Sequence, residues 1–500
     1  MKNRIFVQRL NAILPAVALL FLFSSCDLFK SVPKEEDKVY DEVPGEIKGG
    51  KVYDPQTGKT EEVDNIPTKS DTIYWRKNPP TDAPPIKSDG QNTGGNTDNF
   101  PPNNNTGNPT DNGNNSPSGN DTMTPSVMKS SYEVAMMLPF VTNQFTLTDS
   151  RIYPKSEWAL QYYAGAKIAL DQLRGEGISL NINVLDTQGD ERKTETELTN
   201  PVVANADMII GPYRSVNVRK VAEFAKTRGI PVVSPYSAAS NISNDNPWLV
   251  QCRPTLQTHI EKITEHALSK FDASQIVLVV QDKPEERARL ALFQQAHREI
   301  KKTDAVTPFR EFIAPDRDNL ENLPIAQYLN RGSNTVFIVP VWSSEVFVNS
   351  FLRQVEIARW QGDRISVYGM PQWMEYANTD YDYFEKLSVR VTNAFFVNKN
   401  TDEARRFRQT FYDRHGKRAE EPAYLGYDVM LYFGRQINKN GTEFQRNLAD
   451  NEADLLQTSF RFAPVYEAVP GTDANAPVER YENRYVHMLK FSDYQWRKDL

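Results

Sequence analysis

The sequence contains few cysteines and histidines and no glycine-rich phosphate loop. Cys26 and Cys252 are the only two cysteines among 500 residues, and two thiols cannot form a disulfide framework or a thiolate metal site. The five histidines are scattered, without a carboxylate at metal-ligand spacing. No Gly-x-Ser-x-Gly elbow occurs either. We therefore predict a protein that is not an enzyme and that uses no cofactor and no metal.

A basic surface stripe is also missing. The formal net charge is -7 at pH 7, which argues against a nucleic-acid partner because nothing would offset phosphate repulsion. Hydrophobic residues make up 39% of the chain and charged residues 25%, proportions that exclude a collagen, a multi-span membrane protein and a wholly disordered chain. The length of 500 residues predicts two to four domains.

The first 25 residues have the pattern of an export signal. Lys2, Arg4 and Arg9 precede an unbroken apolar run, Ile13 to Phe23. A helix of that length covers about 16 Å, against about 30 Å of hydrocarbon, so the run is a secretory signal rather than a membrane span. Ser24-Ser25-Cys26 resembles the lipobox of bacterial lipoproteins, although a signal followed by a chance cysteine is the alternative. The resemblance implies cleavage before Cys26 and a lipid anchor there, in the inner or the outer membrane of the cell envelope.

Residues 26–130 have the composition of a tether. Ser88 to Asp121 contains no aliphatic side chain and one aromatic, Phe100, so it cannot bury enough apolar area to offset backbone entropy. The repeat of Lys38–Asp41 at Lys51–Asp54 leaves a small hairpin or docking strand as an alternative to a disordered tether. A flexible chain of this length would reach roughly 55 Å.

From about residue 131 the pattern alternates between strand and helix. Such alternation predicts α/β architecture with parallel sheets covered by helices on both faces, and the length is too great for one sheet, so we expect two doubly wound lobes. The predicted strands are 133–140, 178–185, 208–210, 230–235, 275–280, 309–313, 335–340 and 365–368, and the predicted helices are 157–174, 215–228, 255–271, 284–300, 317–330 and 343–359.

Polar side chains and tryptophans follow these strands. In open parallel sheets the ligand site lies beyond the carboxyl ends of the strands. The residues at those ends are Asp186, Gly211 to Ser215, Ser234 to Ser237, Gln281-Asp282, Val341-Trp342 and Met370 to Trp373.

An ordered set of segments resembles the type I periplasmic binding proteins, such as the leucine/isoleucine/valine-binding proteins. The segments are Tyr163–Leu170, Ile210–Val216, Ile230–Pro235, Leu249–Thr255, and Phe407–Gly416 followed by Gly426-Tyr427-Asp428. Leu138-Pro139 and Tyr368–Trp373 are also similar to segments of a related group, the lipoproteins that activate penicillin-binding proteins.

The resemblance implies a two-lobed clamp with a three-segment hinge. The first lobe would comprise 131–250 plus 393–450, and the second 255–385 plus 455–500, with crossings near Arg253, Val391 and residue 455. A ligand that touches both lobes would favour their closed arrangement.

In this family, the loops that match Gly211–Ser215 and Ser234–Ser237 hold the carboxylate of the ligand. Each loop leads into a helix start, where free N–H groups attract an anion. We expect Ser215, Ser234 and Ser237 to add hydroxyl donors, Tyr213 and Tyr236 to wall the pocket, and Asp186 to join them. The alternative is that Ser215 is only an N-cap and that Ser234-Pro235 is only a turn.

The second lobe departs from amino-acid binders. Gln281–Glu286 replaces an aromatic-glycine turn, and Gln372 and Trp373 stand where an acid would pair with the ligand amine, with Glu375 slightly beyond. Trp342 and Trp373 either stack on a sugar or ring or belong to the core. The basic cluster Arg405, Arg406, Arg408 and Arg414 favours a solvated helix face over a docking patch.

These observations predict a lipoprotein that captures a small polar, amino-acid-like or other anion-bearing solute between two lobes, for delivery to an ABC permease or for sensing. The alternative is a non-catalytic regulator or scaffold of peptidoglycan synthesis with the same fold, whose partner is a cell-wall synthase.

Overall fold

The computed structural model of the protein describes residues 51–54, 59–62, 126–145, 152–243, 245–317, 320–466 and 477–499. The predicted signal, Cys26 and most of the predicted tether lie outside these residues. Within the tether, β1 (Lys51–Asp54) pairs antiparallel with β2 (Lys59–Glu62), as a small hairpin. In the described part of the chain, no helix is long and apolar enough to cross a membrane.

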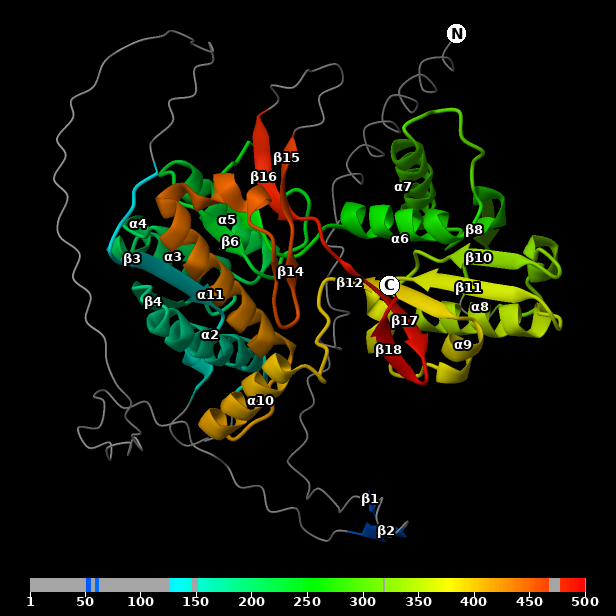
Figure 1. Ribbon diagram of the computed structural model, residues 1–500, viewed down its shortest axis with the longest axis horizontal. Coiled ribbons are helices and arrows are strands. Elements are labelled where there is room, and N and C mark those ends of the chain that lie inside the picture. The colour runs from blue at the N-terminus through cyan, green and yellow to red at the C-terminus, as the bar shows by residue number, and fades with distance from the viewer. Residues whose placement is uncertain are drawn as a thin grey trace, which may run out of the picture. The chain divides into compact units, whose positions relative to one another are not determined.

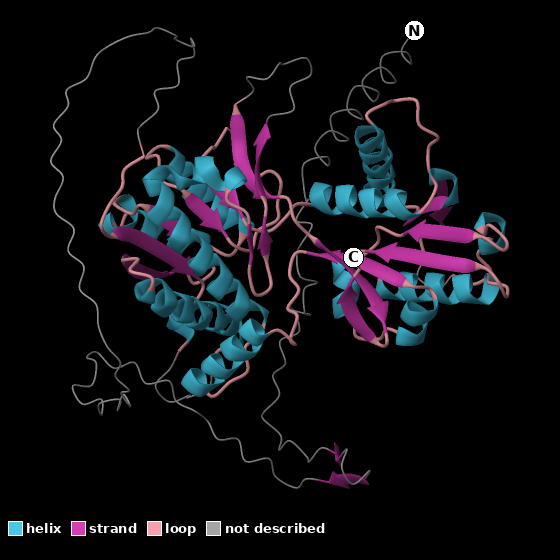
Figure 2. Ribbon diagram, viewed as in Figure 1, coloured by secondary structure: helices cyan, strands magenta, loops and turns pink. Residues whose placement is uncertain are grey.

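The body contains two seven-stranded sheets, each flanked by helices (Figures 1 and 2). The first sheet has the order β15-β16-β7-β6-β5-β3-β4, in which every neighbouring pair except β15–β16 is parallel. Its strands are β3 (Tyr132–Leu138), β4 (Leu180–Asp186), β5 (Met208–Ile210), β6 (Val232–Ser234), β7 (Leu249–Gln251), β15 (Phe462–Tyr466) and β16 (Val478–Asn483). Its helices are α2 (Glu157–Gly175), α3 (Glu191–Leu198), α4 (Pro201–Ala204), α5 (Ser215–Lys226), α10 (Asp402–His415) and α11 (Glu421–Asn440).

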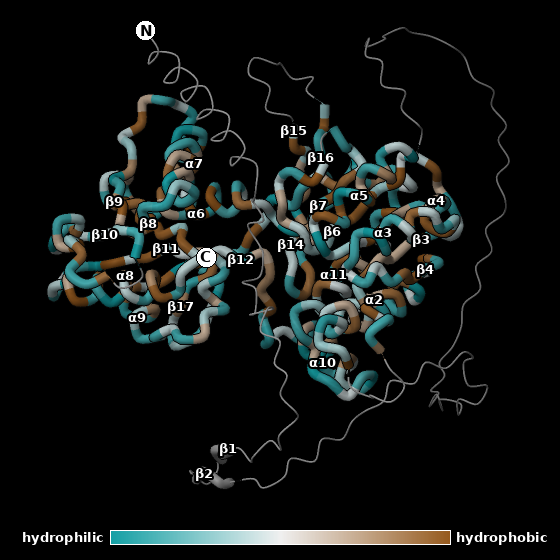
Figure 3. The backbone as a smooth tube through the Cα atoms, turned by 180° about the vertical axis from the view of Figure 1, so that it is seen from behind, coloured by the Kyte–Doolittle hydropathy of each residue, from teal (hydrophilic) through white to brown (hydrophobic). Residues whose placement is uncertain are grey.

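Alternate residues of the central strand β3 enter two different cores. Val134, Met136 and Leu138 pack with α2 and α11 on one face. Ala135 and Met137 pack with α3 and α5 on the other face. Because side chains of a strand point alternately to opposite faces, a continuously apolar strand must be covered on both sides. Figure 3 shows the same hydrophobic concentration along the strands.

Helices α2 and α11 approach each other through glycine. A Cβ atom at Gly165 would lie 1.8 Å from the carbonyl oxygen of Ala423, and one at Gly426 would lie 1.9 Å from that of Tyr162. Only a residue without a side chain allows such a close backbone approach. This contact fixes the first turn of α11, which forms part of the site described below.

The second sheet has the order β18-β17-β12-β11-β10-β8-β9, with β17 antiparallel to both of its neighbours. One large core, from Ile260 to Phe491, fills this lobe. The strands are β8 (Ile276–Gln281), β9 (Arg310–Ala314), β10 (Asn334–Ile338), β11 (Arg364–Gly369), β12 (Val389–Asn393), β17 (His487–Ser492) and β18 (Gln495–Lys498). The helices are α6 (Leu256–Lys270), α7 (Pro284–Lys301), α8 (Glu345–Ala358) and α9 (Tyr381–Lys386). The doubly wound, two-lobed α/β fold is therefore confirmed.

The structure corrects two sequence-based expectations. The helix predicted over 317–330 is absent among the described residues of that range, where only a 3-10 turn forms, η4 (Ile325–Tyr328). Pro324 has no N–H to donate and disfavours helical backbone before it, while buried Leu320, Ile325 and Leu329 imitate a helical spacing. The assignment of all of 455–500 to the second lobe is also wrong, because β15 and β16 pair in the first sheet.

The third crossing between the lobes consequently lies at 484–486, between β16 and β17, rather than near 455. The segment at 456–458 instead packs on α11; it connects the short antiparallel strands β13 (Ala453–Asp454) and β14 (Ser459–Phe460). The buried Asp428 carboxylate accepts the backbone N–H groups of Leu456, Gln457 and Thr458 at 2.9–3.0 Å. The Gln457 carbonyl accepts from Phe396 N at 3.0 Å and from the ring of His487 at 3.1 Å. Gln457 is thereby held between two crossing segments.

Candidate functional site

Two loops at the carboxyl edge of the first sheet carry the predicted serines. Ser215 begins α5 and Ser237 follows β6, and their hydroxyl oxygens lie 2.8 Å apart, within hydrogen-bond distance. Ser234, fully buried at the end of β6, has a hydroxyl without a hydrogen-bond partner in the described structure. Gly211 permits this arrangement, since it has φ +99° and a Cβ there would lie 2.2 Å from the Met137 carbonyl oxygen.

The predicted tyrosines stack on each other beside these serines. The rings of Tyr213 and Tyr236 are 4.4 Å apart with an interplanar angle of 22°, and Trp158 lies 4.5 Å from Tyr213. The Arg253 guanidinium lies 4.6 Å from the Tyr236 ring and 5.2 Å from that of Phe395. Burial, and then the neighbouring Tyr236, raise the pKa of Tyr213. We call Tyr213, Ser215, Ser234, Tyr236 and Ser237 the loop cluster.

Asp186 has a different set of contacts. Its carboxylate accepts backbone N–H groups of Val141, Thr142 and Gln188 and the Thr142 hydroxyl, at 2.7–3.1 Å. A carboxylate with four donors is already satisfied. In this structure Asp186 holds the loop after β3 rather than presenting a free acceptor.

The predicted residues of the second lobe are mostly internal. Trp373 is 1% exposed, and its indole N–H donates to the Val341 carbonyl at 2.7 Å. Gln372 is buried beside it. Trp342 is half-buried, and the Arg289 guanidinium lies 3.6 Å from its ring. Of the two alternatives for the tryptophans, Trp373 thus has the core role.

A buried acid lies near Trp342. Glu286 accepts the Gln281 N–H at 2.8 Å and the Ser343 hydroxyl at 3.2 Å, and Arg289 lies 4.0 Å away. Burial raises the pKa of Glu286 although these partners oppose the shift. Side chains of the protein itself therefore occupy this end of the second sheet.

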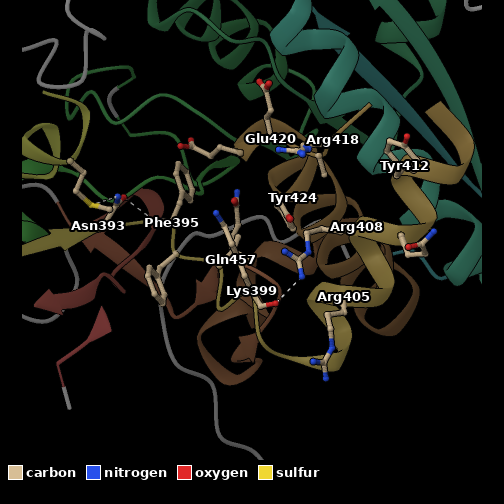
Figure 4. Close-up of a pocket in the computed structure, with 16 residues that line it drawn as sticks. Asn393, Phe395, Lys399, Arg405, Arg408, Tyr412, Arg418, Glu420, Tyr424 and Gln457 are labelled. Carbon is tan, nitrogen blue, oxygen red and sulfur yellow. Dashed lines mark hydrogen bonds between the residues drawn. The ribbon is translucent and has the colours of Figure 1, made fainter. Parts of the chain in front are cut away.

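One cavity among the described residues lies at the hinge, against the first lobe. It has a volume of about 850 Å³ and includes segment 393–397, α10, the loop before α11 and the first turn of α11 (Figure 4). Met374, which follows β11, and Asn393, at the end of β12, are the contributions of the second lobe. We call it the hinge cavity; its lining is Met374, Asn393, Phe395, Phe396, Val397, Lys399, Arg405, Arg408, Gln409, Tyr412, Arg418, Ala419, Glu420, Glu421, Tyr424 and Gln457.

Acidic side chains stand at one end of this cavity. Glu421, in the first turn of α11, is exposed to solvent and lines the cavity. Desolvation raises the pKa of its carboxyl group, the Arg253 charge opposes that shift, and Glu375 adds to it. Because Arg253 also touches Tyr236 and Phe395, it joins the loop cluster to the wall of the hinge cavity.

None of the nine predicted ligand-binding residues lines the hinge cavity. The cluster of arginines in α10 indicated the hinge cavity only in part. Arg405 and Arg408 line the cavity. Arg406 instead pairs with Glu403, and Arg414 with Asp171, on the surface. Gln457 gave no signal, because its place depends on distant Asp428. In the described residues, no group of three or more His, Cys, Asp or Glu side chains could hold a metal ion.

Comparison with known proteins identifies the class. The sequence model of the periplasmic binding protein family matches residues 154–469, more than half of the chain, and the chain therefore belongs to that family. It is a family of substrate-binding proteins rather than enzymes, which places the chain in the periplasm or cell envelope. No curated protein matches the sequence.

Solved structures share the fold at low identity. A protein assigned as a branched-chain amino acid ABC transporter from Rhodospirillum rubrum has a TM-score of 0.53 at 14% identity, over 73% of this chain and 99% of that one. An ABC transporter substrate-binding protein from Desulfitobacterium hafniense, in complex with Leu, has a TM-score of 0.46 at 13% identity, over 74% and 100%. The family match and the Rhodospirillum rubrum structure confirm the predicted resemblance at the level of fold.

Proposed function

We propose that the chain captures a small polar solute between its two lobes, for uptake by an ABC permease or for sensing. The observation that carries the proposal is the hinge cavity, which combines charged, amide and aromatic side chains at the junction of the lobes. Ligand pockets likewise combine apolar and aromatic surface with placed polar groups that fix the orientation of the ligand.

The solute would favour one arrangement of the two lobes because it contacts both of them. Met374 reaches the cavity from the second lobe, whereas Phe395 and Tyr424 belong to the crossing segment and the first lobe. A ligand that contacts both sides stabilises the arrangement in which both sides reach it. The loop cluster borders this volume through Arg253, and we propose that Ser215 and Ser237 contact the solute from that border.

A specific observation also favours a second candidate, a non-catalytic regulator of cell-wall synthesis. Ser215 and Ser237 are hydrogen-bonded to each other, and Tyr213 stacks on Tyr236. Two of the side chains that would receive a ligand carboxylate are therefore already engaged with each other. In that case the surface of the protein, rather than a solute, would carry the function.

The proposal includes a lipid anchor at Cys26. It is supported by the apolar run Ile13–Phe23 and the small residues Ser24 and Ser25 before the cysteine. Mass spectrometry of the mature N-terminus tests it: a diacylglyceryl adduct on Cys26 is expected, and an unmodified cysteine would contradict it.

A thermal-shift and calorimetric screen of the full chain against amino acids, amides, sugars and cell-wall fragments tests solute capture. We expect a saturable hit whose affinity falls at least tenfold in Phe395→Ala, because the ring is part of the cavity wall. Phe145→Ala is the control, since Phe145 is 58% exposed and lies outside the cavity. The absence of any hit, together with cross-linking to a cell-wall synthase, would reject capture in favour of the regulator.

A further inference from the structure

Three cationic side chains of the hinge cavity have no acidic partner. Lys399, Arg408 and Arg418 form no ion pair with a described residue, whereas Arg405 is compensated by Asp402. The Arg408 guanidinium donates only to carbonyl oxygens, those of Lys399 at 2.8 Å and Ala404 at 3.3 Å (Figure 4). Lys399 and Arg408 meet at the start of α10, so the cavity is positive there, whereas Arg418 follows α10 and lies beside Glu420 (Figure 4).

Gln457 adds a buried donor without an acceptor. The residue is 2% exposed, and its side-chain Nε2 has no hydrogen-bond partner in the described structure although the residue lines the cavity. Figure 4 shows its side chain between those of Phe395 and Tyr424. An unsatisfied buried amide is costly, and the backbone of Gln457 cannot move to relieve it because Asp428 and Phe396 hold it. An acceptor oxygen on a ligand would satisfy this donor.

Part of the wall is apolar. Phe395, Phe396, Val397 and Tyr424 present aromatic and aliphatic surface. Glu420 and Glu421, at the start of α11, also line the cavity, and Glu420 lies beside Arg418 and away from Lys399 (Figure 4). The cavity is therefore positive beside Lys399 and Arg408 and of mixed charge where Arg418 and the two glutamates stand.

We propose that the ligand of the hinge cavity is an organic oxyanion with an apolar face. Its phosphate or carboxylate oxygen accepts from Gln457 Nε2 and faces Lys399 and Arg408, while its body packs on Phe395 and Tyr424. Charge-assisted hydrogen bonds of this kind are the strong ones, and planar guanidinium groups match oxyanions. The inference rests on the proposed capture of a solute and names its chemical class.

Calorimetric titration of the full chain with phenyl phosphate, benzoate, benzamide and inorganic phosphate tests separately the negative charge and the apolar body of the proposed ligand. We expect phenyl phosphate or benzoate to bind at least tenfold more tightly than neutral benzamide, and more tightly than inorganic phosphate, which lacks the apolar body. The affinity should fall as salt increases, because the cavity is open to ions.

Two variants locate the effect. Gln457→Met keeps the length of the side chain and removes the donor, so affinity for the bound anion should fall roughly 10- to 100-fold, since a hydrogen bond to a charged group is at stake. The melting temperature of the free protein should stay the same or rise, because an unsatisfied donor is removed. If the amide had only a structural role, its loss would lower the melting temperature. Arg408→Gln should weaken binding as well, whereas Arg406→Gln, on the same helix but outside the cavity and paired with Glu403, should not.

The outcomes separate this inference from the proposal on which it rests. If a neutral or zwitterionic solute binds in the wider screen, and Gln457→Met leaves that binding unchanged, the oxyanion is wrong and solute capture stands. If benzamide binds as tightly as the anions, the proposal of an oxyanion ligand is likewise wrong. If no solute of any class binds, both fail.

Discussion

The close contact of α2 with α11 makes a quantitative prediction about stability. In Gly165→Ala the new methyl carbon would lie 1.8 Å from the Ala423 carbonyl oxygen, which is backbone and cannot rotate away. Ordinary contact needs more than 3 Å, so the two helices must separate. Overpacking of a core costs typically 1–3 kcal/mol, and because the obstacle is backbone we expect a loss of about 3 kcal/mol.

Gly175 in the same helix is the matched control. It is exposed, and a Cβ there would meet nothing within 4 Å. Alanine is favoured over glycine in helices, so Gly175→Ala should stabilise the protein by roughly 0.5–1 kcal/mol. The free energy of unfolding from urea titration, monitored by circular dichroism, measures both changes.

The reciprocal contact allows a stronger test. Gly426→Ala places a methyl carbon 1.9 Å from the Tyr162 carbonyl oxygen, at the same crossing. Once one substitution has separated the helices, the second costs less, so the double variant should lose less than the sum of the single losses. If Gly165→Ala were as stable as Gly175→Ala, the backbone contact between α2 and α11 could not be as described.

Two further predictions concern buried groups. Burial lowers the pKa of His259 to about 3 and that of His487 to about 4. Below pH 6.5 the folded state therefore binds fewer protons than the unfolded state. Each of these two histidines should lower the free energy of unfolding by about 2 kcal/mol at pH 5 relative to pH 8. The difference between the urea midpoints at the two pH values should therefore become smaller in His487→Gln. An unchanged difference would refute the lowered pKa of His487. Trp373→Ala should lose about 3–5 kcal/mol because the ring is core, whereas Trp360→Ala, at a ring 67% exposed, should lose less than about 1 kcal/mol; equal losses by the same titration would contradict this.

Most of the fold could be predicted because the apolar periodicity of strands and helices is local. The strands β3, β5 and β6 are short apolar runs that end in turn residues, and their buried positions follow from that pattern. The predicted helix at 317–330 failed because buried side chains of an irregular segment imitated helical spacing. The place of β15 and β16 could not be predicted, since sheet membership depends on pairing between distant segments.

The site was less predictable than the fold. The loop cluster was found because the carboxyl ends of parallel strands converge, and Ser215 and Ser237 do meet there. The hinge cavity was missed because its walls come from the crossing segment, a helix pair and Gln457, which are separate in the sequence. A count of arginines in α10 does not reveal that Arg408 points to a cavity while Arg406 pairs with Glu403 at the surface.

Hydrogen–deuterium exchange of the full chain, with and without the solute found in the screen, tests the central claim most directly. The account predicts that bound solute slows exchange at 393–397 and 420–424, which wall the hinge cavity, and at the adjoining loops 211–215 and 234–237. Protection confined to other surfaces, or no protection at saturating solute, would contradict capture at the hinge.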